Sequence, residues 1–214
     1  MCHWPLRSSE LWDQYAARGN VPLLNRCGML SVGPREGELI SGILKSSAIH
    51  GLDATEYTSA EIRRTFPAFA PDEEHVGVFE PTAGWIDSNA ALEAAQGSAK
   101  QYGASLRLDD PVYQWVHRGT HFEVTTASAT VTADKLVITA GAWTSQLLQQ
   151  LGLPLRVERK VLTWITPIYP ALFQPPAFPV FAFSEGFLYD FPAIGDRGVK
   201  LYKRRMQNRP VNAA

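Results

Sequence analysis

The sequence predicts a mixed α/β fold of the α+β kind, and two observations favour it. Up to Gly152, runs with helical apolar spacing alternate with short β-branched runs. After Gly152 the chain changes to short aromatic strands separated by glycine turns, which is typical of an antiparallel sheet. The 214 residues, 45% of them hydrophobic, suffice for one large or two small domains with a sizeable core.

Three helices are expected in the first part of the chain. Residues 8–18 carry their apolar side chains on one face, and residues 36–50 repeat apolar side chains at helical spacing up to Gly51. A third, short helix begins near Ser59, which is a candidate N-cap.

Strands are expected between these helices. Residues 23–32 form one strand, and residues 76–87 form another, interrupted by a turn at Glu80-Pro81. A long helix with an alanine-rich face follows, capped by Ser88 or Asn89. The later strands are expected at residues 105–108, 112–116, 122–126, 156–165, 181–183, 187–191 and 198–202, with a hairpin turn at 117–121 and irregular, proline-rich chain at 169–179.

The junction near residue 140 is where the sequence most favours a ligand. Residues 136–139 are apolar or β-branched and predict a short buried strand, and residues 143–152 predict a helix. Three residues of little bulk, Ala140, Gly141 and Ala142, connect them. A strand that opens through small residues into a helix lets a ligand approach the backbone, although a plain strand-to-helix turn explains the pattern equally well.

Composition and charge exclude several classes of function. The formal net charge is −1, so neither nucleic acid nor an anionic membrane is expected as a partner. No apolar run has the length of a membrane span, and the N-terminus lacks a signal-peptide pattern. Cys2 and Cys27 have no metal-ligand spacing, the histidines fall in loops or helix ends, and a reduced cytoplasmic setting is expected with no metal.

Lys200 is the best candidate for a chemically active side chain. If Val199 and Leu201 face one side of their strand, Lys200 faces the other, within an aromatic β layer that would partly desolvate its charge. Tyr189 could place its hydroxyl in the same cavity. From the pattern alone, a surface lysine and a packing tyrosine stay open as the alternative.

The whole chain resembles the amine-oxidising flavoenzymes of the D-amino-acid-oxidase superfamily, in particular the group of monomeric sarcosine oxidase and N-methyltryptophan oxidase. Short motifs in the family's order carry the resemblance from residue 6 to about 202. They are Leu6-Arg-Ser-Ser-Glu-Leu-Trp12, Gly28-Met-Leu-Ser-Val-Gly-Pro34, Phe79-Glu-Pro-Thr-Ala-Gly84, Tyr102-Gly-Ala104, Thr132-Ala-Asp-Lys-Leu-Val-Ile138 with Gly141-Ala-Trp143, Leu188-Tyr-Asp-Phe-Pro192 and Gly198-Val-Lys-Leu201.

The resemblance implies two intertwined domains. A partial Rossmann-like FAD-binding domain would comprise residues 1–22 and 85–150. An antiparallel β-sheet substrate domain would comprise residues 23–84 and 151–214. The implied reaction is the oxidation of a secondary or N-methyl amino acid, such as sarcosine, to an imine, with oxygen reduced to hydrogen peroxide in a monomeric enzyme.

The resemblance also implies roles for individual residues. Val112 and the turn Ala140, Gly141, Ala142 and Trp143 would contact FAD through their backbone, which suits small side chains. Lys200 resembles the family's active-site lysine beside the flavin, where a fixed cation assists the reaction with oxygen. Tyr189 resembles a tyrosine that lines the substrate pocket.

The sequence departs from the family pattern in ways that bear on activity. The family's glycine-rich FAD loop is not found before Cys2, and the segments that follow the lysine strand in the family are not found either. Neither Cys2 nor Cys27 matches the cysteine that binds flavin covalently, so covalent flavin is not expected. We expect a central fragment of such an enzyme, without FAD or amine turnover when isolated.

Two other functions stay open. One is a non-catalytic remnant or interaction module that uses an exposed sheet edge, since an apolar edge strand invites pairing with another chain. The other is a related dehydrogenase or a tRNA-modifying FAD protein, against which the pair Lys200 and Tyr189 argues.

Overall fold

The structure is a computed structural model that describes residues 3–19, 21–184 and 188–203. The chain divides into two compact units, Met1–Ser98 with Val161–Arg205 and Ala99–Lys160 with Met206–Ala214. The first unit is therefore built from two separated stretches of sequence. The division into an FAD domain and a substrate domain at residues 22, 84 and 150 stays a prediction.

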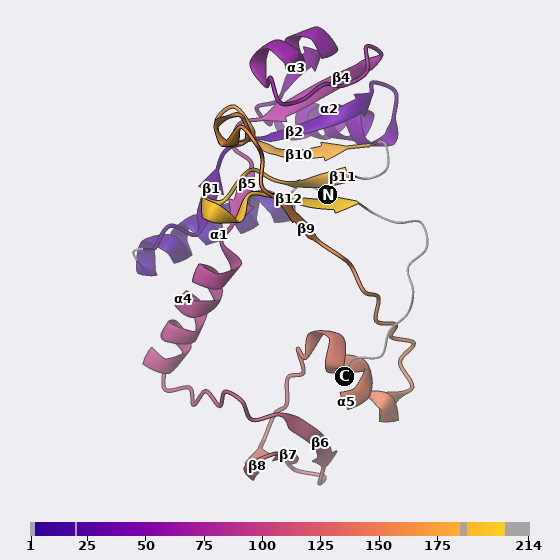
Figure 1. Cartoon of the computed structure of the whole chain (residues 1–214). Coiled ribbons are helices and arrows are strands. Elements are labelled where there is room, and N and C mark those ends of the chain that lie inside the picture. Colours follow the sequence, from indigo (N-terminus) through magenta and orange to yellow (C-terminus); the bar gives the residue numbers. More distant parts are fainter. Residues whose placement is uncertain (1–2, 20, 185–187, 204–214) are drawn as a thin grey trace. The chain divides into compact units, whose positions relative to one another are not determined.

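A seven-stranded sheet forms the centre of the first unit (Figure 1). Only β2 and β10 run parallel to each other; the other neighbouring strands are antiparallel. Strands β1 (Leu24–Arg26) and β5 (Gly84–Ile86) form a separate antiparallel pair. The strand order in the large sheet is β3 (Thr55–Thr58), β4 (His75–Glu80), β2 (Met29–Pro34), β10 (Val180–Phe183), β11 (Leu188–Phe191), β12 (Val199–Lys203) and β9 (Thr163–Ile165).

The expected helices of the first unit are present. Helix α1 spans His3–Gly19 and α2 spans Glu38–His50, and Gly51 ends α2 in the left-handed conformation at φ 62°. Helix α2 packs on β2 and β4, and α3 (Ser59–Thr65) packs on β3 and β4 (Figure 1). The expected N-cap of α3 is wrong by one residue. Thr58 caps it in a capping box: the Thr58 hydroxyl oxygen accepts a hydrogen bond from the Glu61 backbone N–H, and the Glu61 carboxylate accepts one from the Thr58 backbone N–H.

The expected cap of the alanine-rich helix α4 (Ser88–Gln101) is also wrong. One carboxylate oxygen of Asp87 accepts hydrogen bonds from the backbone of Asn89, at 3.0 Å, and of Ala90, at 3.1 Å. The backbone N–H groups in the first turn of a helix have no carbonyl acceptor within the helix. Asp87, whose side chain accepts from two of them, is therefore the N-cap of α4. The backbone of Asp87 in turn donates to Leu23, which ties the start of α4 to β1.

The core of the first unit is rich in phenylalanine. Phe69 stacks on Phe178 with ring centroids 4.5 Å apart and meets Phe181 edge to face at 5.4 Å. Both geometries are favourable for aromatic pairs. The buried cluster consists of Leu30, Val32, Ile62, Phe66, Phe69, Phe178, Phe181 and Val199.

The second unit contains a three-stranded antiparallel sheet of β6 (Val112–His117), β7 (Phe122–Thr126) and β8 (Thr130–Ala133). The predicted strands 112–116 and 122–126 and their hairpin turn are confirmed, whereas residues 105–108 are irregular. The indole nitrogen of Trp115 donates to the Leu147 carbonyl at 2.8 Å, which joins β6 to helix α5 (Thr144–Leu147).

The expected strand at residues 136–139 is wrong. This stretch is irregular, and Val137 is 83% exposed. Within the described residues no strand pairs with it, and β-branched side chains alone do not hold a strand without a neighbour. The expected helix at 143–152 is broken into a 3₁₀ turn at Gly141–Trp143, the short α5 and a second 3₁₀ turn at Gln149–Leu151.

Two further expectations concern the chain around and after Val161, where it re-enters the first unit. The strand expected at 156–165 is confined to β9, while the proline-rich region 169–179 is irregular as expected, apart from a 3₁₀ turn at Pro170–Phe173. The tail from Arg204 onward, expected to be frayed, lies outside the described residues. Across the described residues, no helix is both long and apolar enough to span a bilayer.

The phenylalanine core should dominate the stability of the first unit. Replacing Phe69 by alanine removes the stack on Phe178 and leaves a cavity, and we expect a loss of about 3–5 kcal/mol in the free energy of unfolding. Tyr169→Ala, at a side chain 69% exposed, is the control and should change stability by less than about 0.5 kcal/mol. Urea denaturation measures both, and equal losses would contradict this account of the core.

The capping of α4 gives a second prediction. Asp87→Ala should cost about 1 kcal/mol of unfolding free energy, because the backbone groups of Asn89 and Ala90 lose their acceptor. Ser88→Ala, at one of the two residues that the sequence favoured, should have little effect. Thermal unfolding of the two variants decides between them, and a larger loss for Ser88→Ala would show that Ser88 is the cap.

Candidate functional site

The pairing of three strands places Lys200 opposite two aromatic residues. In the register of β12, Lys200 lies across from Phe191 of β11 and from Trp164 of β9. Residues directly opposite in an antiparallel pair point to the same face of a sheet. Tyr189 and Tyr202 form the next pair on that face. We call these five residues, Tyr189, Phe191, Trp164, Lys200 and Tyr202, the Lys200 face.

The opposite face of β12 belongs to the core. Val199 is 4% exposed and lies in the phenylalanine cluster, and Leu201 packs against that cluster. The alternation expected from the sequence, with Val199 and Leu201 on one side and Lys200 on the other, is therefore confirmed.

Aromatic contacts hold the side chains of the Lys200 face. The Lys200 ammonium lies 4.6 Å from the centroid of the Phe191 ring, within the range of a cation–π interaction. The rings of Tyr189 and Tyr202 are 5.1 Å apart. Tyr202 is buried, whereas Tyr189 is 48% exposed.

Gly198 makes the approach of β9 to β12 possible. Its φ of +79° is one that other residues rarely adopt, and a Cβ atom there would collide with the Ile165 carbonyl. A side chain at this position would push β9 away and separate Trp164 from Lys200.

A cavity of about 780 Å³ adjoins the Lys200 face. Lys200, Trp164 and Phe191 line it from the sheet, and the first turn of α4 lines it from the other side. The remaining lining residues are Trp85, Ile86, Asp87, Ser88, Asn89, Ala90, Glu93, Ile194, Gly195, Asp196 and Arg197. Three acids and two bases thus share a cavity with three large aromatic rings.

Tyr189 does not line this cavity. It shares the Lys200 face but lies one pair further along β11, beside Tyr202. Tyr189 and Lys200 thus share one face of the sheet, but the aromatic ring in contact with the Lys200 ammonium is that of Phe191 and not that of Tyr189.

The predicted cofactor-binding residues lie in the second unit. Val112 begins β6, and Gly141, at φ +54°, opens the 3₁₀ turn that contains Ala142 and Trp143. The Trp143 backbone donates to the Ala140 carbonyl at 3.0 Å, and the Trp143 side chain is 54% exposed. Apart from its chain neighbours, no described residue has a heavy atom within 4 Å of the place where a Cβ of Gly141 would be, so there is open space on that side of the turn.

Trp164, Phe191 and Asp87 are among the residues of the Lys200 cavity that were not singled out from the sequence. Trp164 and Phe191 become neighbours of Lys200 only through the pairing of β9, β11 and β12. The register of such a pairing cannot be read from the residues around Lys200 in the sequence. Asp87 had a recognisable signal, because an aspartate directly before an alanine-rich helix is a typical N-cap pattern.

Comparison with known families decides the class of protein. The family profile described as DAO, FAD dependent oxidoreductase, matches residues 2–202. The chain belongs to the DAO family. The resemblance inferred from the short motifs is thereby confirmed, and the DAO family is one of FAD-dependent oxidoreductases.

Two curated members of the family are similar to this chain in sequence. Monomeric sarcosine oxidase of Streptomyces avermitilis is 32% identical over 202 residues, which cover 92% of this chain and 53% of that enzyme. N-methyl-L-tryptophan oxidase of Yersinia pestis is 30% identical over 193 residues, covering 89% of this chain and 52% of that enzyme. The chain spans about half the length of the curated relatives it matches.

Solved structures confirm the DAO fold. NikD, an amino acid oxidase essential for nikkomycin biosynthesis, superimposes with a TM-score of 0.76 at 22% identity over 96% of this chain and 55% of its own. L-proline dehydrogenase from P. horikoshii gives 0.72 at 18% identity over 93% and 54%. The α/β fold class expected from the sequence is confirmed.

The described residues fit a flavin in two respects. The Lys200 cavity has flat aromatic walls and a cation, which suit a planar ring system that acquires negative charge. The turn at Gly141 leaves its backbone open, which suits the close approach of a dinucleotide.

The contact between Lys200 and Phe191 should be measurable as a coupling energy. In a double-mutant cycle with Lys200→Met and Phe191→Leu, we expect a coupling of about 0.5–1 kcal/mol in the free energy of unfolding. The same cycle with Lys45, an exposed lysine of α2, and Phe191 should show none. Additive effects in the first cycle would mean that Phe191 does not hold the lysine.

Proposed function

We propose that this chain carries part of the active site of an FAD-dependent oxidase that converts a secondary or N-methyl amino acid, of the sarcosine kind, to an imine. The substrate loses two electrons and two protons in this reaction, and oxygen takes them up to give hydrogen peroxide. The identity with sarcosine oxidase and N-methyl-L-tryptophan oxidase supports the substrate class. The placement of Lys200 in an aromatic cavity is the observation that carries the proposal.

Lys200 has the geometry of an electrostatic catalyst. Its ammonium is fixed against Phe191 and faces the cavity, so its position is set before any charge develops. Bound flavin supplies the two-electron chemistry, and the protein supplies orientation and charge. A cation fixed beside the place where oxygen is reduced stabilises the negative charge that develops there.

The remaining predicted residues have supporting roles in this proposal. The open backbone at Ala140, Gly141, Ala142 and Trp143, together with Val112, holds the dinucleotide part of FAD. Tyr189, half exposed on the Lys200 face, lines the place where the amino acid binds. The enzyme acts as a cytoplasmic monomer on a small-molecule substrate.

One observation favours a second function, that of an interaction module without flavin. Strand β9 is a sheet edge with all three residues exposed, and Trp164 and Ile165 are 42% and 46% exposed. An apolar edge strand offers unpaired backbone groups to another chain.

The test uses the natural protein that contains this sequence. Its visible spectrum should show bound flavin, and sarcosine should release hydrogen peroxide. Lys200→Met should retain flavin and its reduction by the amine but slow reoxidation by oxygen by about 10²-fold, because the cation beside the developing charge is gone. Stopped-flow absorbance separates the two half-reactions.

Lys45→Met is the matched control, because this lysine lies exposed on α2 of the same unit. It should leave both half-reactions unchanged. Equal reoxidation rates for Lys200→Met and the parent would refute the role of Lys200. A colourless protein that releases no peroxide would refute the oxidase proposal and favour the interaction module.

A further inference from the structure

A second cavity of the first unit differs from the Lys200 cavity in its charged residues. It measures about 420 Å³ and is lined by residues of α1, α2, β1, β5 and the end of β4. The two cavities have only Ile86 of β5 in common among their lining residues. Its walls are largely apolar, with Leu6, Trp12, Leu24 and Ile43 contributing side chains.

Glu80 is the only ionisable residue that lines this cavity among the described residues. It is the last residue of β4 and is partly buried, and this burial raises the pKa of its carboxyl group. In the described part of the chain, no group donates a hydrogen bond to the carboxylate and no cation pairs with it. A carboxylate taken partly out of water without a partner costs free energy that a bound cation would recover.

Ser47 supplies a second polar group without a partner. It lies in α2, is 8% exposed and lines the same cavity. Its hydroxyl oxygen makes no hydrogen bond within the described structure. Buried hydroxyl groups are nearly always hydrogen-bonded in proteins, so the unpaired Ser47 hydroxyl marks imperfect packing in the wall of this cavity.

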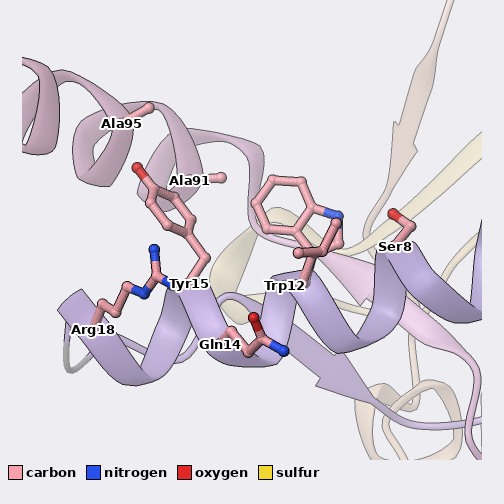
Figure 2. Close-up of a pocket in the computed structure, with 8 residues that line it drawn as sticks. Ser8, Trp12, Gln14, Tyr15, Arg18, Ala91 and Ala95 are labelled. Atoms are coloured by element: carbon pink, nitrogen blue, oxygen red, sulfur yellow. The ribbon is translucent and has the colours of Figure 1, made fainter.

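The α1 side of the cavity is formed by one turn of helix. Ser8 and Trp12 are four residues apart, and both also line the adjoining groove between α1 and α4 (Figure 2). In that groove Trp12 and Tyr15 lie toward the small residues Ala91 and Ala95 (Figure 2). The indole of Trp12 thus gives the cavity that Glu80 lines an aromatic wall, a combination that favours organic cations.

We propose that this cavity binds a small organic ammonium ion with an apolar body, whose charged group pairs with the Glu80 carboxylate. The single negative charge selects a monocation over an anion or a neutral molecule. The apolar walls cover the body, and the volume lies within the range of small-molecule sites. The site requires no flavin, so its test is independent of the oxidase proposal.

Isothermal titration calorimetry with three probes of one shape tests the charge selection. Phenethylamine, which is a cation at neutral pH, should bind saturably. Phenethyl alcohol should bind about ten-fold more weakly, and hydrocinnamate, an anion, should not bind. Equal binding of the three probes, or no binding of phenethylamine, would overturn the proposal.

Variants locate the site. Glu80→Gln keeps the shape of the side chain and should weaken phenethylamine binding about ten-fold while leaving phenethyl alcohol unchanged. Asp196→Asn is the matched control, because it removes an acid from the Lys200 cavity, and it should bind phenethylamine like the parent. Loss of binding in Asp196→Asn with none in Glu80→Gln would place the amine in the Lys200 cavity and overturn the proposal.

The pH dependence gives a readout that a misfolded variant would not mimic. Because the pKa of Glu80 is raised by burial, its charged fraction grows as the pH rises through that pKa, while the ammonium stays protonated. Phenethylamine affinity should therefore rise with pH in the parent and stay flat in Glu80→Gln.

Stability provides the companion measurement. A carboxyl group with a raised pKa contributes stability at low pH that is lost as the pH rises through the folded-state pKa. Without ligand, the parent should therefore lose stability relative to Glu80→Gln as the pH rises, and saturating phenethylamine should restore it. A flat stability difference with pH would contradict the buried, unpaired state of Glu80 on which the site depends.

Discussion

The register of β12 is the constraint on which the site depends. A slip of one residue would exchange the two faces of the strand, placing Lys200 in the phenylalanine core and Val199 in the cavity. The cost of burying an unpaired ammonium among apolar rings prevents this. The core on one face therefore fixes the direction of the lysine on the other, and Gly198 allows β9 to come close enough to add Trp164. One face of β12 thus contributes to the core, and the other face carries the candidate catalytic lysine.

Two cavities with different sets of charged residues follow from how the first unit is assembled. Glu80 and Ile86, on either side of the turn between β4 and β5, line the cavity whose single ionisable group is an acid. The Lys200 cavity begins at Ile86 and Asp87 and holds both signs of charge, with Asp87 already occupied in capping α4. We propose that the Glu80 cavity binds an organic cation. We propose that the Lys200 cavity holds a group that becomes negatively charged during a reaction. The proposed oxidase function would use the Lys200 cavity and assigns no role to the Glu80 cavity.

Local patterns in the sequence were sufficient for helices α1 to α4, the glycine stop at Gly51 and the two faces of β12, because each depends on neighbours along the chain. They were not sufficient for the helix expected at 143–152, which is broken into short turns. They failed at residues 136–139, where a strand pattern lacks a pairing partner among the described residues. They placed the N-cap of α3 one residue late and that of α4 one or two residues late, because the hydrogen bonds made by Thr58 and Asp87 show only in the folded geometry. Lys200 could be chosen from the sequence, but its contacts with Phe191 and Trp164 are set by strand pairing. The cavity of Glu80 and Ser47 has no local signal, because a strand end and a helix form it together.

The central claim is that the Lys200 face forms one wall of a flavin site. A crystal structure of the flavin-bound natural protein tests it most directly. We predict the isoalloxazine ring in the cavity beside Trp164 and Phe191, with the Lys200 ammonium within direct or water-bridged hydrogen-bonding reach of the ring. A flavin bound elsewhere, with the Lys200 face covered by other polypeptide, would contradict the account.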